Sequence, residues 1–259
     1  CRLCVVEHEE TGRMVASCTT PVAAGMRVLT HSPEVVRHRR TILHLLAEQY
    51  PAEAPAGEET EFHRALRDHG LEPTGARRSD VFADRDHPYL RVEMDRCIHC
   101  YRCVRICDEL QGQFTWRVWD RSDGTRIVPD SGGPLQGSSC VSCGACADTC
   151  PTGAIIDRAI VERGTPTHWT RTTCPYCGTG CEMEVGVREG QVIVARPVAD
   201  APVSKGHLCV KGRYAHRFAH AEDRVTEPMI RTDGQWRKVS WDEALSTTAA
   251  GFRAALDKG

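Results

Sequence analysis

Short apolar runs separated by polar turn residues open the chain, and this pattern predicts strands. Two such runs are Met14–Ala16 and Met26–Leu29. From Ser32 onward the period becomes that of a helix, with Ser32 as N-cap and Pro33 at the first helical position. We expect this helix to end before Pro51. Its predicted apolar stripe consists of Val35, Val36, Ile42, Leu43, Leu45 and Leu46.

The rest of the chain shows shorter patterns that predict loops, a hairpin and a further helix. Residues 51–60 are acidic and contain Pro and Gly, so they predict a loop, and the Gly/Ser/Asp-rich segment 121–139 predicts an excursion loop. Met183–Val187 and Val192–Ala195 flank Glu189–Gly190, which indicates a β-hairpin. Ser240 and Glu243 form a capping box that opens an Ala-rich helix.

An internal repeat carries the first chemical signal. The spacing C-x2-C-x2-C-x3-C occurs over Cys97–Cys107 and again over Cys140–Cys150, 43 positions later. Three thiolates at this spacing cover one face of an iron–sulfur cubane, and the fourth ligates the neighbouring cluster. We therefore assign Cys97, Cys100, Cys103 and Cys150 to one [4Fe–4S] cluster, and Cys140, Cys143, Cys146 and Cys107 to another.

Composition narrows the alternatives for these cysteines. The chain has 259 residues, a net charge of −2 and 15 cysteines, an odd number that rules out a fully paired disulfide set. Zinc is the stronger rival, but structural zinc sites usually combine separated C-x2-C pairs, and a third Cys three residues further on has no tetrahedral role. The balanced charge gives no reason to expect nucleic acid, and no apolar stretch is long enough for a bilayer.

A third set of thiols is Cys174, Cys177 and Cys181, followed by Cys209. Spacing alone leaves zinc and a [4Fe–4S] cluster open. However, TCPYCGTGC with LCVKGR resembles the iron–sulfur subdomain that opens the molybdopterin-guanine-dinucleotide oxidoreductases. That resemblance implies a cluster next to the pterin, with Lys211 as the electron relay between them; without it, Lys211 would be a solvated surface lysine.

The first three cysteines, Cys1, Cys4 and Cys18, cannot complete a four-thiolate site. They resemble the later part of a plant-type [2Fe–2S] domain, which implies a fourth ligand upstream; the alternative is a degenerate domain with spare thiols. Relatives with this domain commonly carry a further H-x3-C-x2-C-x5-C cluster. No Cys lies between Thr19 and Arg96, so we expect that cluster to be absent and His63 and His69 to be ordinary surface histidines.

Together these features predict an α+β multi-domain chain. We expect a partial β-grasp [2Fe–2S] domain (1–31), a helical linker (32–88), a two-cluster bacterial ferredoxin-like domain (89–160), a β-rich [4Fe–4S] subdomain of the molybdopterin oxidoreductase fold (168–225) and the start of the pterin-binding catalytic domain (226–259). KGRYAHRFAHAEDRVTEPMIR, from Lys211, is particularly similar to formate dehydrogenase α-subunits.

The resemblance implies electron transfer within a cytoplasmic, NAD-linked formate dehydrogenase with molybdenum or tungsten bis-molybdopterin guanine dinucleotide. The implied partners are flavin- and NAD-binding iron–sulfur subunits and the remaining catalytic domain, with neither nucleic acid nor membrane insertion. This segment alone lacks the metal ligand and the substrate-binding residues. Two alternatives stay open: an iron–sulfur subunit of a complex I-like NADH dehydrogenase, and a stand-alone electron-transfer subunit.

Overall fold

The computed structural model describes residues 1–53, 55–57 and 59–258. The chain forms two compact units, Cys1–His216 and Arg217–Gly259. The first unit begins with an antiparallel sheet of order β2-β1-β3, formed by β1 (Val5–His8), β2 (Met14–Ala16) and β3 (Val28–Leu29). The predicted strand at Met14–Ala16 is confirmed, whereas the one at Met26–Leu29 shortens to its last two residues.

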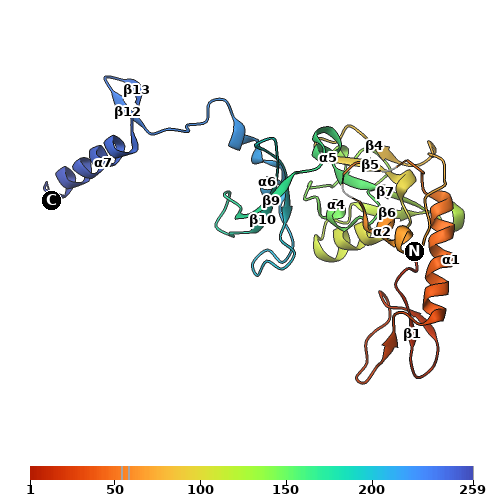
Figure 1. The fold of residues 1–259 in the computed structure, drawn as a ribbon. Coiled ribbons are helices and arrows are strands. Elements are labelled where there is room, and N and C mark those ends of the chain that lie inside the picture. The colour runs from red at the N-terminus through yellow and green to blue at the C-terminus, as the bar shows by residue number, and fades with distance from the viewer. Residues whose placement is uncertain (54, 58, 259) are drawn as a thin grey trace. The chain divides into compact units, whose positions relative to one another are not determined.

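Helix α1 (Pro33–Gln49) begins as predicted, since the Ser32 side chain accepts a hydrogen bond from the backbone N–H of Val35. Figure 1 shows the β1–β3 sheet beside the N-terminal part of this helix. The buried face of α1 is narrower than predicted: Val35, Leu43 and Ala47 are buried. Val36 and Leu45 are 41% and 56% exposed, so part of the predicted apolar stripe is uncovered.

Residues of α1 and of the segment after it form a hydrophobic core. Helix α2 (Glu61–Asp68) is capped by Thr60, and its Phe62 and Leu66 pack with Leu43 and Tyr50. The next sheet has order β4-β5-β8, from β4 (Ala83–Asp84), β5 (Leu90–Glu93) and β8 (Ile155–Asp157). Two short helices, α3 (Arg102–Arg105) and α4 (Ala145–Thr149), carry cysteines of the two repeats. Cys103 and Cys146 are therefore part of the same buried core as the sheet.

The segment predicted as an excursion loop contains regular structure. Strand β7 (Arg126–Pro129) pairs with β6 (Trp116–Trp119) in an antiparallel hairpin, and short 3₁₀ turns lie at Ser122–Gly124 and Leu135–Gly137. The prediction failed because four strand residues, Arg126 to Pro129, lie among Gly, Ser and Asp residues. Leu135 and Ile127 are buried against the sheet, so the hairpin covers one side of the core.

The last part of the first unit is β-rich. After α5 (Arg158–Arg163), a sheet of order β11-β10-β9 is formed by β9 (His168–Thr173), β10 (Glu182–Arg188) and β11 (Gln191–Pro197). The predicted hairpin is confirmed. Its turn residues Glu189 and Gly190 both have positive φ, at 52° and 75°, as a tight two-residue hairpin turn requires. Helix α6 (Val210–Tyr214) packs against β11.

The second unit contains the hairpin of β12 (Met229–Thr232) and β13 (Gln235–Lys238), followed by α7 (Trp241–Leu256). The predicted capping box is confirmed, because the Ser240 side chain accepts a hydrogen bond from the N–H of Glu243 at 3.2 Å. Throughout the part of the chain that the structure describes, no helix has the length and apolar character needed to cross a bilayer.

Candidate metal centres

The two cysteine repeats have the same local geometry. His99 and Ser142 occupy equivalent positions, and both have a left-handed backbone, with φ of 52° and 55°. This conformation is unfavourable for residues with a Cβ. In each repeat it turns a backbone N–H toward sulfur: His99 N lies 3.4 Å from Cys97 Sγ, and Ser142 N lies 3.3 Å from Cys140 Sγ. Such N–H groups stabilise a thiolate ligand.

The first group of thiols combines both repeats. Burial raises the pKa of Cys97 to about 12, and Cys150 and Cys100 contribute to the rise. The pKa of Cys103 is also raised by burial and then by Cys97, Cys146, Cys150 and Cys100. Cys150 therefore lies within electrostatic range of the first run, although it belongs to the second.

The second group shows the reciprocal arrangement. Burial raises the pKa of Cys140, and Cys143 and Cys107 raise it further. The pKa of Cys143 follows the same pattern, with Cys107 again the neighbouring thiol. Cys107 lies in a single π-helical turn, Ile106–Leu110, which displaces it from the α3 helix that precedes it. Cys146 also raises the pKa of Cys103, so the two groups lie near each other.

These donor sets fit iron–sulfur clusters chemically. Each group gathers four thiols in a largely buried place, where several thiolates would repel one another and lack solvation. A cationic iron–sulfide core removes that repulsion, because thiolates are its natural ligands. Within the described ranges of the chain, no three Cys, His, Asp or Glu side chains converge on a point where one metal ion would sit.

A third group surrounds a cavity of about 300 Å³. Burial raises the pKa of Cys181, and Cys174, Cys177 and Cys209 raise it further, so all four thiols interact. Hydrogen bonding with Thr179 lowers the pKa of Cys177, and the charge of Lys211 lowers it further. All four cysteines line the cavity together with Lys211 and Gly212. A Cβ at Gly212 would lie 3.2 Å from Cys174 Sγ, so glycine admits the close approach of helix and thiol.

The N-terminal thiols lie against the first repeat. Cys4 Sγ is 3.2 Å from Cys18 Sγ, and the hydrogen bond between them raises the pKa of Cys18. Cys1, Cys4 and Cys18 line a cavity of about 740 Å³, and Cys100 lies in its wall. The N-terminal cysteines therefore line the same cavity as a residue of the first thiol group.

The two candidate histidines between Thr19 and Arg96 differ from the surface residues expected. His63 is half-buried beside Tyr50, with ring centroids 5.2 Å apart, and burial lowers its pKa. Among the described residues its buried Nε2 has no hydrogen-bond partner. His69 is also half-buried, and its Nδ1 lies 2.9 Å from the carbonyl oxygen of Ala65. Both rings thus belong to the packing of α2.

Four known domain families match the chain in succession. These are the 2Fe-2S iron-sulfur cluster binding domain (1–33), the ferredoxin-like domain of NADH-quinone oxidoreductase subunit 3 (87–156), the Molybdopterin oxidoreductase Fe4S4 domain (167–221) and Molybdopterin oxidoreductase (224–259).

Curated relatives carry several different names. One subunit of an NADH-quinone oxidoreductase of Rhizobium meliloti is 35% identical over 94% of this chain and 29% of its own length. The α subunit of a Geobacter sulfurreducens NADPH-Fe(3+) oxidoreductase is 34% identical over 98% of this chain and 30% of its own length. A Staphylococcus aureus protein provisionally named a formate dehydrogenase is 27% identical over the whole chain and 31% of its own length. The chain thus spans about three tenths of these relatives.

One solved structure is also similar in part. It is an NAD+-reducing [NiFe]-hydrogenase in its H2-reduced state, 28% identical, with a TM-score of 0.48; the match covers 61% of this chain and 69% of that one.

Proposed function

We propose that this chain is the electron-conducting part of a molybdopterin-dependent formate dehydrogenase. It carries a 2Fe-2S domain, a ferredoxin-like domain and the Fe4S4 domain of molybdopterin oxidoreductases, and these domains serve iron–sulfur electron transfer. The complete enzyme would interconvert formate and CO2 at molybdenum or tungsten held by two molybdopterin guanine dinucleotides. It would exchange electrons with NAD through flavin- and NAD-binding subunits.

One observation carries the proposal: the thiols form successive groups through the first unit. Cys1, Cys4 and Cys18 share a cavity with Cys100. The first thiol group adjoins the second through Cys103 and Cys146. The third group lies on the next module along the chain, around its own cavity. Clusters at these places would supply one-electron chemistry, and the protein would fix their order and exclude water.

We propose all 15 cysteines as ligands, for three [4Fe–4S] clusters and one [2Fe–2S] cluster whose fourth ligand is outside this sequence. Lys211 is proposed to bridge the third group and the pterin. Its ammonium is compact, positive and has three donors, which suits a negatively charged cluster and a polar pterin edge. Its place in the wall of the third cavity supports that role.

A second function is favoured by the relatives. The 35% identity to an NADH-quinone oxidoreductase subunit exceeds the 27% identity to the Staphylococcus aureus protein. In that case the chain would carry electrons from NADH toward a quinone or metal acceptor, with no formate chemistry. The four-thiol third group with Lys211, which suits a pterin neighbour, favours the formate proposal.

The two functions can be distinguished with the complete enzyme, purified without oxygen. Formate and NADH are added in turn, and reduction of the iron–sulfur absorbance is followed, with metal analysis of the same preparation. The formate proposal requires molybdenum or tungsten and reduction by formate. Reduction by NADH alone, without either metal, would establish the second function instead.

The assignment of the thiols to iron–sulfur clusters is tested by measuring the iron content. The loaded chain should contain about 12 iron atoms in three cubanes, or about 14 with the [2Fe–2S] centre. An equimolar amount of zinc with little iron or sulfide would overturn it.

A further inference from the structure

A buried arginine joins the third thiol group to the second. Arg213 is 2% exposed and lies in α6, two residues after Lys211. Its guanidinium holds Asp148 with two bonds, Nη1 to Oδ2 at 2.5 Å and Nη2 to Oδ1 at 2.8 Å. It also holds Asp157, with Nη2 at 2.8 Å from Oδ2 and Nε at 3.3 Å from Oδ1. The Tyr214 hydroxyl completes the cluster, donating to Asp157 Oδ1 at 2.7 Å.

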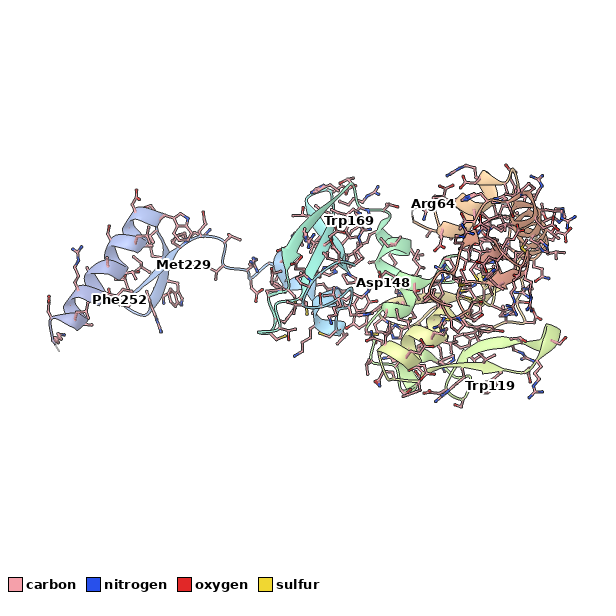
Figure 2. The ribbon with its side chains drawn as sticks, turned by 90° about the horizontal axis from the view of Figure 1, so that it is seen from below. Arg64, Trp119, Asp148, Trp169, Met229 and Phe252 are labelled. Carbon is pink, nitrogen blue, oxygen red and sulfur yellow. The ribbon has the colours of Figure 1, made fainter. Side chains whose placement is uncertain are left out.

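Each partner lies next to a proposed cluster ligand or to the sheet that supports one. Asp148 is in α4, between Cys146 and Cys150, and Asp157 ends strand β8. Figure 2 shows Asp148 where the ferredoxin-like module meets the module that contains Trp169. On the other side, Gly212 brings α6 against Cys174. Of two adjacent residues in one short helix, Gly212 therefore lies against a thiol of the third group, and Arg213 bonds the aspartate between Cys146 and Cys150.

The space that the Arg213 side chain occupies depends on a glycine of the second repeat. Gly144 has φ of 77°, and a Cβ there would lie 2.2 Å from Arg213 Nε and 2.6 Å from the Tyr214 hydroxyl. Tyr214 in turn stacks on Tyr89, with ring centroids 4.4 Å apart and planes at 9°. The arginine is thus held by packing as well as by charge.

Charge explains why an arginine can be buried here. Burial alone would lower the pKa of the Arg213 guanidinium. The negative charges of Asp157 and Asp148 outweigh the effect of burial and hold the pKa of Arg213 well above its usual value. A planar guanidinium satisfies both carboxylates at once, which an ammonium cannot do with the same geometry. Removing one member of such a set leaves uncompensated buried charge.

We infer that Arg213 is a positioning residue, which locks the module of the third thiol group onto the second and so fixes the separation of the two redox sites. The inference rests on the proposed iron–sulfur wiring, and it gives the arginine of the LCVKGR motif a role distinct from that of Lys211. Electron transfer depends steeply on separation, so a rigid bidentate contact serves it better than a mobile surface pair.

The test uses the iron-loaded chain and three variants. Arg213→Lys keeps the charge and loses the bidentate fork. Arg213→Met, combined with Asp148→Asn and Asp157→Asn, removes the charges together so that none is left unpaired. Arg171→Met is the matched control, since Arg171 pairs with Glu182 in the same module, away from the junction, and is 52% exposed. Iron is counted, and magnetic coupling between the reduced clusters is recorded by electron paramagnetic resonance.

The wild-type chain and the Arg171 control should show the signal of the third-group cluster split by its neighbour. We expect Arg213→Lys and the triple variant to retain the iron and to lose that splitting, with faster proteolysis between residues 158 and 170. Unchanged splitting in either variant would overturn the inference. Loss of iron from both would also overturn it, because Arg213 would then be a folding element. A wild-type chain without iron–sulfur signals would instead refute the proposed function.

Discussion

Gly144→Ala tests whether the junction is as tightly packed as its geometry implies. The new methyl group meets two obstacles. Its backbone would keep a left-handed conformation, at φ of 77°, which costs about 1–2 kcal/mol for a residue with a Cβ. Its Cβ would also lie 2.2 Å from Arg213 Nε and 2.4 Å from Cδ, so the guanidinium must leave its carboxylates. Breaking a buried ion pair costs about 3–5 kcal/mol, and the total is about 4–7 kcal/mol.

Gly190→Ala is the matched control. Gly190 has nearly the same φ, 75°, but nothing lies within 4 Å of its Cβ position, so only the backbone cost of about 1–2 kcal/mol remains. Urea unfolding midpoints of the two iron-loaded variants are compared without oxygen, by absorbance and circular dichroism. Gly144→Ala should unfold at much lower urea than Gly190→Ala. In an Arg213→Ala background, the extra cost of the Gly144 substitution should become smaller, because Arg213 Cδ and Nε are gone and the Tyr214 hydroxyl, 2.6 Å from the Cβ position, is the close contact that remains. Equal midpoints for the two alanine variants would refute the packing argument.

Two further predictions concern ligands and relay. Cys107→Ser should deplete the cluster held mainly by the second cysteine run, and Cys150→Ser the one held mainly by the first, as counted by Mössbauer spectroscopy; damage confined to each residue's own run would contradict the crossed arrangement. In the complete enzyme, Lys211→Ala should retain iron and pterin metal and lose most turnover, and Lys211→Arg should also be impaired because its charge is displaced. Normal turnover by Lys211→Ala would make Lys211 an ordinary surface residue.

Local signals in the sequence were sufficient for several elements. Ser32 and Ser240 cap their helices as predicted, because a side-chain oxygen three residues before a free N–H acts without tertiary help. The turn at Glu189–Gly190 is equally local. The cysteine runs predict which thiols should meet across the repeats, since the spacing itself limits which sulfurs one cluster can reach, and this ligand assignment stays a prediction.

Features that depend on distant partners could not be predicted. Nothing near Arg213 in the sequence indicates that its carboxylates lie 65 and 56 positions earlier, and the motif drew attention to Lys211 instead. The exposure of Val36 and Leu45 depends on where α1 finds its neighbours, which helical periodicity does not specify. A buried arginine would have been suspected only from Gly144, whose position in a tight cysteine run leaves room for a large side chain.

The linker between the N-terminal sheet and the ferredoxin-like module serves a structural purpose that does not require metal. Tyr50 is 2% exposed and donates its hydroxyl to the carbonyl of Thr152 at 2.7 Å, and Phe62 N–H donates to the carbonyl of Pro151 at 2.9 Å. Both acceptors directly follow Cys150, so the linker supports the loop that carries this thiol.

The proposed chain of clusters would therefore not need thiolates in the linker. Cys1, Cys4 and Cys18 already share a cavity with Cys100, and the charge of Arg105, which lies in the same wall, reaches Cys18. An aromatic core in the linker holds the N-terminal sheet and the first repeat in register, and the cavity brings their cysteines together. In the proposed wiring, packing of the linker, rather than a further cluster held between Thr19 and Arg96, would connect the two modules.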